Sequence, residues 1–254
     1  MVIDIRMNFV RYDALGRPFG VEGVLAAMKK YGIERAILVP RLAVDCDFRL
    51  GNKEIFEAIK ADDRLFGYLV VNPNYPEEST QLMRSVMNSQ KFLAAAFFQG
   101  ASMPYPNVDD YREILNAYRR FGKPVFVQTS HAEAVTAAQE MAKEFPTIKF
   151  IFGSMGDDGW KRAMTSHLIL NVVLETSGSF YAEKIEEAAT LIGPHRVLFG
   201  SDLPFSDPAS MLALIQNSNI SQETAAKILG ENANRLFGFD RLAAEEETEA
   251  GETG

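Results

Sequence analysis

Short apolar runs alternate with amphipathic segments along the chain. Eight runs rich in β-branched and aromatic residues predict strands at residues 1–8, 35–41, 65–73, 92–100, 124–130, 149–156, 171–178 and 196–202. Most of these runs are apolar on both faces, which is typical of a parallel sheet covered by helices. Between them, apolar residues at three- and four-residue spacing predict helices at residues 20–32, 52–63, 109–122, 132–145 and 181–193.

This alternation predicts a single α/β domain, a (β/α)8 TIM barrel. Strand-then-helix order through eight cycles favours a closed barrel over an open, doubly wound sheet. A dinucleotide-binding fold needs a glycine-rich turn after the first strand, and residues 9–12, Phe-Val-Arg-Tyr, do not supply one. We expect residues 1–240 to form the barrel and residues 241–254 to form a disordered acidic tail.

Composition and charge narrow the choice of partners. The 254 residues are 47% hydrophobic and 24% charged, which suits a substantial core. The net charge is −8, but residues 243–254 hold five Glu and no Lys or Arg, so the rest of the chain carries only −3. We therefore expect a small-molecule partner, with no nucleic acid and no membrane. Cys46 is the single cysteine, and with no secretion signal in the sequence we expect a cytoplasmic protein. Whether it is a homo-oligomer stays open.

Polar residues at the carboxyl ends of the strands predict where the site lies. Residues of the first strand alternate faces, so Asp4, Arg6 and Asn8 share one face and Ile3, Ile5 and Met7 the other. The apolar set suits the helix layer, which places Arg6 and Asn8 inward at the mouth of the barrel. The other strand ends contribute Arg41, Asn72, Gln99, Gln128, Ser154, Glu175 and Asp202. Such a polar ring on an apolar barrel indicates a binding site.

Several motifs resemble one family of barrel proteins. Residues 198–205, Leu-Phe-Gly-Ser-Asp-Leu-Pro-Phe, resemble the eighth strand of the amidohydrolase-2 branch of the amidohydrolase superfamily, which includes aminocarboxymuconate-semialdehyde decarboxylase. Residues 227–238 are similar to the terminal helix of that family, and residues 1–8, 124–130 and 149–156 are similar to its first, fifth and sixth strands. The resemblance implies a TIM-barrel metal-dependent hydrolase or decarboxylase.

The metal-binding histidines that this resemblance implies are replaced here. The first-strand pair falls on Arg6 and Asn8, the fifth-strand histidine on Gln128 and the sixth-strand histidine on Ser154, whereas the eighth-strand aspartate is kept as Asp202. A catalytic zinc site needs about three good protein donors, and a guanidinium has no lone pair to give. We therefore expect no metal site of the family type and no other cofactor.

Arg6 and Asp202 are the leading catalytic candidates. The resemblance implies that Asp202 lies beside the first-strand pair, where an ion pair with Arg6 would present a fixed cation to a carboxylate or enolate. Asp202 would then act as general base or orient Arg6, although such a pair could also merely fill a vacated pocket. His131, after the fifth strand, is a candidate general acid or base, or an exposed residue at a helix start.

The expected substrate contacts are Asn8, Arg41, Asn72, Gln99, Gln128, Ser154, Trp160 and Glu175. Trp160 would wall the pocket or pack its own helix, and Asn72 and Glu175 would contact substrate or hold the barrel together. Three functions stay open. The first is a metal-independent hydrolase or lyase acting on a small organic acid or lactone. The second is a non-catalytic ligand-binding or assembly barrel, and the third is a metal-dependent hydrolase with atypical oxygen ligands.

Overall fold

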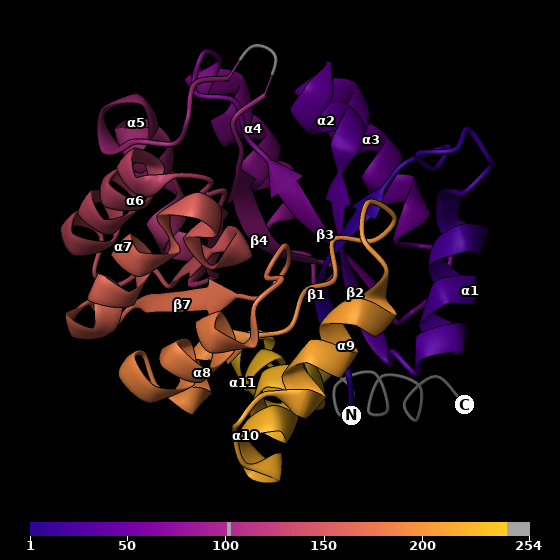
Figure 1. Cartoon of the computed structure of the whole chain (residues 1–254). Coiled ribbons are helices and arrows are strands. Elements are labelled where there is room, and N and C mark those ends of the chain that lie inside the picture. The colour runs from indigo at the N-terminus through magenta and orange to yellow at the C-terminus, as the bar shows by residue number, and fades with distance from the viewer. Residues whose placement is uncertain (101–102, 243–254) are drawn as a thin grey trace.

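A computed structural model of the chain describes residues 1–100 and 103–242. Its core is a parallel sheet of eight strands in sequence order, namely β1 (Ile3–Phe9), β2 (Arg35–Pro40), β3 (Leu65–Val70), β4 (Phe92–Phe97), β5 (Val125–Val127), β6 (Phe150–Phe152), β7 (Val172–Glu175) and β8 (Val197–Leu198). The sheet closes where Ile5 N–H donates to the Phe199 carbonyl at 3.0 Å and Asn8 N–H donates to the Leu203 carbonyl at 2.6 Å. The predicted (β/α)8 barrel is confirmed (Figure 1).

Helices follow the strands and surround the barrel (Figure 1). They are α1 (Gly20–Tyr31), α2 (Arg41–Asp45), α3 (Phe48–Ala58), α4 (Pro76–Val86), α5 (Val108–Tyr118), α6 (Ala132–Glu144), α7 (Trp160–Met164), α8 (Ala182–Leu191), α9 (Pro208–Asn217), α10 (Gln222–Ala226) and α11 (Asn232–Phe237). The helix predicted at 52–63 begins earlier, because the Asp47 side chain accepts hydrogen bonds from the N–H groups of Arg49 and Leu50 and so caps α3. No helix in the described part of the chain is long and apolar enough to cross a membrane.

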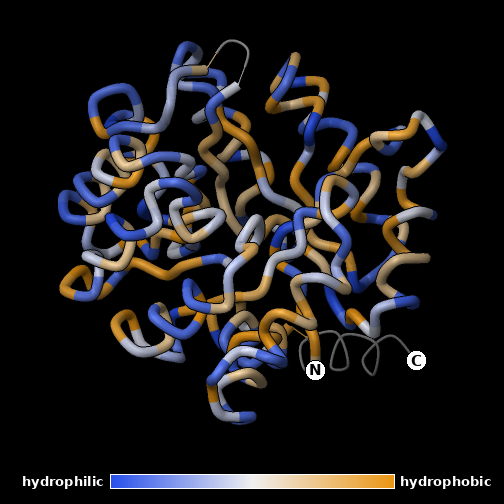
Figure 2. The backbone as a smooth tube through the Cα atoms, in the orientation of Figure 1, coloured by the Kyte–Doolittle hydropathy of each residue, from blue (hydrophilic) through white to orange (hydrophobic). Residues whose placement is uncertain are grey.

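The apolar core has two layers. The outer layer lies between the strands and the helices, and the inner layer fills the barrel with side chains that include Tyr68, Phe98 and Phe126. Beyond α11, the ring of Phe239 packs 4.9 Å from that of Phe66 and adds to the inner layer. In Figure 2 the central strands are mostly orange, whereas the surrounding helices alternate between orange and blue, as amphipathic helices should.

A bulge in β1 sets which side chains enter the barrel. The pairing of β1 with β2 shifts register between Asp4 and Met7, and Arg6 N–H donates to the Asp4 carboxylate at 3.0 Å. Ile3 and Ile5 belong to the inner layer, so their predicted assignment to the helix layer is wrong. Strict alternation fails across a bulge, which re-aims the residues that follow it. The side chain of Arg6 nevertheless points into the barrel, as predicted.

β6 and β8 are shorter than predicted because the backbone turns sharply where they end. β6 stops at Phe152, and Ser154 and Met155 then adopt left-handed conformations with φ of 55° and 52°. Asp202 likewise has φ of 62°. Such conformations cost non-glycine residues about 1–3 kcal/mol each and recur at functional sites. Ser154 and Asp202 therefore lie in tight turns at the barrel mouth rather than in strands.

Candidate functional site at the barrel mouth

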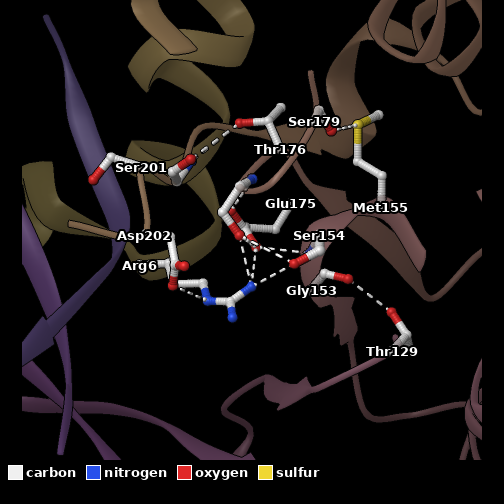
Figure 3. A network of polar contacts seen from close by, with 12 residues as sticks. Arg6, Thr129, Gly153, Ser154, Met155, Glu175, Thr176, Ser179, Ser201 and Asp202 are labelled. Carbon is white, nitrogen blue, oxygen red and sulfur yellow. Dashed lines mark hydrogen bonds and ion pairs between the residues drawn. The ribbon is translucent and has the colours of Figure 1, made fainter. Parts of the chain in front are cut away.

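The guanidinium of Arg6 lies at the centre of a polar network at the barrel mouth (Figure 3). Nη1 donates to the hydroxyls of Ser154 at 2.7 Å and Ser177 at 2.6 Å, and lies 3.4 Å from Oε2 of Glu175. On the other edge, Nε lies 3.3 Å from Oδ1 of Asp202, and Nη2 has no hydrogen-bond partner among the described residues. Nη1 is therefore fixed and Nε is buried beside Asp202, while Nη2 keeps its N–H donors for a ligand.

Glu175 anchors this network from the end of β7. Its carboxylate is fully buried and accepts hydrogen bonds from the N–H groups of Ser177 at 2.5 Å and Ser154 at 3.0 Å. Burial alone would lower the pKa of Arg6, but the carboxylates of Glu175 and Asp202 outweigh it and raise that pKa above its usual value. Arg6 is consequently a permanent cation.

Asp202 joins the first and last strands. Its backbone N–H donates to the Arg6 carbonyl at 2.8 Å, and its Oδ1 accepts from Nδ2 of Asn8 at 2.9 Å. Oδ2 of Asp202 accepts no hydrogen bond from the described residues, and the side chain is 24% exposed. One carboxylate oxygen is thus held by protein, while the other is available to a ligand.

Asp4 lies buried behind Arg6 and holds the bulge in place. Its Oδ1 accepts from the N–H groups of Arg6 at 3.0 Å and Ser201 at 3.1 Å, which links β1 to the turn after β8. Burial raises the pKa of Asp4 to about 7, and the negative charge of Glu175 adds to that increase. Hydrogen bonds from Ser201 and from backbone N–H groups oppose it. Asp4 therefore positions the guanidinium through the backbone rather than by touching it.

Glycine lets the β8 backbone approach this cluster closely. A Cβ atom at Gly200 would lie 2.0 Å from Oε1 of Glu175 and 3.0 Å from Cβ of Arg6. The approach to Oε1 is too short for any real Cβ atom, so a larger residue at this position would displace Glu175.

Two more of the predicted contacts, Gln128 and Gln99, bond to each other near the mouth. Oε1 of Gln128 accepts from the Gln99 N–H at 3.1 Å, and the Gln99 residue is exposed. Asn72 is buried and structural, because its Oδ1 accepts from the Asn74 N–H at 3.0 Å and its own N–H donates to Ser79 at 3.0 Å. Neither Gln99 nor Asn72 touches Arg6.

Arg41, His131 and Trp160 also lie apart from the Arg6 network. Arg41 forms an ion pair with Asp45 at 2.5 Å, and its Cζ lies 5.5 Å from the ring of Phe205. His131 caps α6, with Nδ1 lying 3.3 Å from Ala134 N and 3.0 Å from Oε2 of Glu133. Trp160 begins α7, and Nζ of Lys161 lies 3.9 Å from its ring.

Sequence reasoning did not single out three members of this cluster. Ser177 lies two residues after Glu175 and bonds both Glu175 and Arg6. Asp4 was placed on the polar face but given no role. Tyr68 packs 5.3 Å from Phe126, whose ring in turn lies 5.5 Å from Cζ of Arg6. A tyrosine in the otherwise apolar run Leu65–Val70 was the available signal, because its buried hydroxyl has no partner among the described residues.

The oxygen donors present do not fit the divalent metal that the family resemblance implies. The positions expected for histidine ligands hold Arg6, Asn8, Gln128 and Ser154, and the Arg6 cation occupies the space between Glu175 and Asp202. The Glu175 carboxylate is already committed to hydrogen bonds with Ser154 and Ser177. In residues 1–100 and 103–242, no three His, Cys, Asp or Glu side chains are grouped so as to hold a metal ion.

Sequence comparison finds relatives that are decarboxylases. The chain is 22% identical over 276 residues to gamma-resorcylate decarboxylase of Rhizobium sp. (strain MTP-10005), covering 87% of this chain and 84% of the relative. It is 29% identical over 119 residues to the gamma-resorcylate decarboxylase of Polaromonas sp. (strain JS666), covering 39% of this chain and 36% of the relative.

Solved structures share the fold. A 5-carboxyvanillate decarboxylase from Novosphingobium aromaticivorans, complexed with manganese and 4-hydroxy-3-methoxy-5-nitrobenzoic acid, superposes with a TM-score of 0.75 at 16% identity, covering 94% of this chain and 96% of that one. An amidohydrolase from Burkholderia multivorans with bound zinc superposes with a TM-score of 0.69 at 14% identity, covering 94% of this chain and 99% of that one. The family model described as Amidohydrolase matches residues 4–239, so the chain belongs to the amidohydrolase family.

Proposed function

We propose that this chain binds a small carboxylic acid at the barrel mouth and catalyses a lyase or hydrolase step on it. Decarboxylation of an aromatic acid is the favoured reaction. The observation that carries the proposal is Nη2 of Arg6, which has no hydrogen-bond partner among the described residues, beside the partly exposed carboxylate of Asp202. A guanidinium cation can bind a substrate carboxylate, and a carboxyl group beside it can transfer a proton.

Exposed aromatic side chains support an aromatic substrate. Tyr12, Tyr105, Phe180 and Phe205 follow β1, β4, β7 and β8, so they lie in loops on the face of the barrel that carries Arg6. They are 62%, 40%, 74% and 50% exposed. Large apolar side chains cost free energy in water, and their presence on this face favours contact with an aromatic ligand. The gamma-resorcylate and 5-carboxyvanillate decarboxylases named above are similar to this chain, which agrees with this choice.

In the proposed reaction the carbon–carbon bond to the carboxylate breaks and carbon dioxide leaves. The bonding electron pair stays on the ring carbon, and that carbon takes a proton from the acid form of Asp202. Arg6 binds an oxygen of the substrate that carries negative charge through Nη2 and stabilises that charge electrostatically. Proton return from water restores Asp202. For a lactone or ester, ionised Asp202 would instead act as general base toward water.

We further propose that this reaction proceeds without the family's metal. Support comes from the donor chemistry, because a guanidinium held by Ser154, Ser177 and Glu175 puts fixed positive charge among the residues that replace the histidines. A divalent cation would be repelled by Arg6 and would find few free oxygen ligands. The manganese and zinc of the solved structures belong to those proteins.

A panel of small acids tests the proposal. Thermal shift is measured with benzoate, 2-hydroxybenzoate, 2,6-dihydroxybenzoate and phthalate, and every acid that binds is then assayed for release of carbon dioxide. The proposal expects at least one acid to raise Tm by mass action and to turn over in wild type. It expects neither effect in Arg6→Gln, and the proposal fails if Arg6→Gln binds and turns over that acid as wild type does.

A second candidate is a non-catalytic barrel, favoured by the three polar contacts that already engage Nη1 of Arg6. In that case the network only seals the barrel mouth. Arg6→Gln would lower Tm, and no acid of the panel would bind to wild type or be decarboxylated by it.

A further inference from the structure

A second cavity opens at the opposite end of the barrel. It has a volume of about 700 Å³ and lies where β6, β7 and β8 begin, whereas Ser154, Ser177 and Asp202 follow the ends of those strands. Leu170, Val173, Ile192, Leu198 and Leu236 form its apolar part. Its polar part comes from Lys149, His195, Arg196, Asn232 and Arg235. No residue that lines it is acidic.

Three cations in this cavity lack carboxylate partners. No carboxylate of the described residues lies within ion-pair distance, 4 Å, of Lys149, Arg196 or Arg235. Of the thirteen other arginines in the described residues, seven are paired with an acid, as Arg41 is with Asp45. Like charges brought together at the rim of an apolar cavity repel one another, and an anion bound among them would remove that repulsion.

Backbone carbonyls hold two of these cations in place. Arg196 donates to the carbonyls of Ile192 at 2.7 Å, Ile169 at 3.0 Å and His167 at 3.0 Å. Lys149 donates to the Leu170 carbonyl at 3.2 Å. Such contacts fix where the charges point without neutralising them, which reduces the ordering cost of binding an anion.

Arg235 is held in a similar way but keeps free donors. Its Nη2 donates to the His195 carbonyl at 3.0 Å and to Oδ1 of Asn232 at 3.2 Å. Nε and Nη1 have no acceptor among the described residues, so this guanidinium can still bind an anion.

We infer that this basal cavity binds a small amphiphilic anion, with a carboxylate or phosphate against Lys149, Arg196 and Arg235 and an apolar body against Val173, Leu198 and Leu236. The cations recognise the charged group, and the leucine and valine surfaces favour a ligand with several carbon atoms over an inorganic ion. The site is separate from the barrel mouth and does not depend on the function proposed there.

His195 supplies a local signal for occupancy. Burial lowers its pKa, and the positive charges of Arg196, Arg235 and Lys227 lower it further. An anion in the cavity would offset those charges and raise the pKa of His195. Because the chain has only three histidines, the C2–H resonance of each can be followed by proton NMR and assigned with His195→Gln.

The test titrates hexyl phosphate, hexanoate, inorganic phosphate and hexanol into the full chain at constant ionic strength. The proposal expects the His195 resonance to move until it saturates and the pKa of His195 to increase. Hexyl phosphate or hexanoate should bind roughly tenfold more tightly than inorganic phosphate, which corresponds to the burial of about two methylene groups. Hexanol should bind far more weakly than either anion.

Variants locate the binding. The double variant Lys149→Gln/Arg235→Gln should bind the anion at least tenfold more weakly than wild type. Lys29 is an exposed cation on α1, and Lys29→Gln should leave the affinity for the anion unchanged. Arg6→Lys should also retain it, which separates this cavity from the barrel mouth. Equal movement of all three histidine resonances, no saturation, equal affinity for inorganic phosphate and the amphiphiles, or unchanged binding in the double variant would each overturn the inference.

Discussion

Oδ1 of Asp202 lies 3.3 Å from Nε of Arg6, while Oδ2 accepts no hydrogen bond from the described residues. The pair joins β1 to the turn after β8, where Asp202 N–H also donates to the Arg6 carbonyl at 2.8 Å. Backbone and side chains therefore couple the same two residues. This coupling fixes the distance between a permanent cation and a titratable group, and the proposed chemistry depends on that distance.

Replacing Arg6 with lysine tests the fork geometry. Lysine keeps the positive charge beside Glu175 but has one nitrogen, which cannot both replace Nη1 in the network and supply a separate donor as Nη2 does. A carboxylate ligand should therefore bind about 10- to 100-fold more weakly. Stability should fall less than in Arg6→Gln, which leaves Glu175 buried and unpaired. Isothermal titration calorimetry and urea unfolding measure the two effects. Arg84→Lys, on the exposed side of α4, is the matched control, and wild-type affinity in Arg6→Lys would exclude a ligand-binding role for Nη2 of Arg6.

Asp202→Asn separates binding from proton transfer. The amide retains the shape of the side chain but cannot donate or accept a proton during turnover, so kcat should fall by about 10²–10⁴-fold. Affinity for the acid should be unchanged or increase, because one negative charge near the substrate is removed. Steady-state kinetics with calorimetry distinguishes the two quantities, with the exposed Asp158→Asn as control. A variant that turns over at the wild-type rate would remove Asp202 from the chemistry.

Gly200→Ala tests the packing behind Glu175. The added methyl group would overlap Oε1 of Glu175 at 2.0 Å, so the variant should lose about 1–3 kcal/mol of unfolding free energy and weaken ligand binding with it. Gly67→Ala in β3, where the new atom would meet its neighbours at 3.4 Å, should lose less stability and retain binding. Equal losses in both variants would argue against a special role for the Gly200 position.

Asp4 predicts a specific pH dependence of stability. The folded chain keeps its Asp4 proton up to about pH 7, whereas an unfolded aspartate releases it near 3.8. Between these values the folded state binds more protons, so the contribution of Asp4 to stability is present at low pH and is lost as pH rises through about 7. Asp4→Asn should therefore gain about 2–3 kcal/mol relative to wild type between pH 5 and pH 8.

Urea unfolding of both proteins across that pH range measures this difference, with Asp158→Asn as the exposed control. Because wild type and variant share every other carboxylate, the remaining acid titrations cancel in the comparison. A difference between wild type and Asp4→Asn that does not change with pH would mean that Asp4 is ionised throughout the range.

Alternation of apolar runs and amphipathic helices was enough to predict the barrel, because each strand must be apolar on both faces in this architecture. The same reasoning correctly directed Arg6 and Asn8 to the mouth but failed for Ile3 and Ile5. A bulge changes which face a residue occupies without leaving a mark in the hydropathy pattern, so it was visible only in the register of β1 with β2.

The ion pair of Arg6 with Asp202 was a prediction of the motif match, and the structure has the two groups 3.3 Å apart. The sequence did not predict that Ser177 and Asp4 take part in the same network. It depends on left-handed turns at Ser154 and Asp202, which shorten β6 and β8 and bring hydroxyls and backbone N–H groups around one guanidinium. Serine and aspartate tolerate such turns, yet neither residue type requires one.

The central claim is that Arg6, rather than a bound metal, holds the substrate carboxylate. The most direct test is the dissociation constant of the tightest-binding acid of the panel, measured by calorimetry on one preparation before and after EDTA treatment, with metal content determined alongside. Our account predicts the same affinity within twofold and far less than one metal ion per chain in both samples. A loss of binding on EDTA treatment that manganese or zinc restores would contradict it.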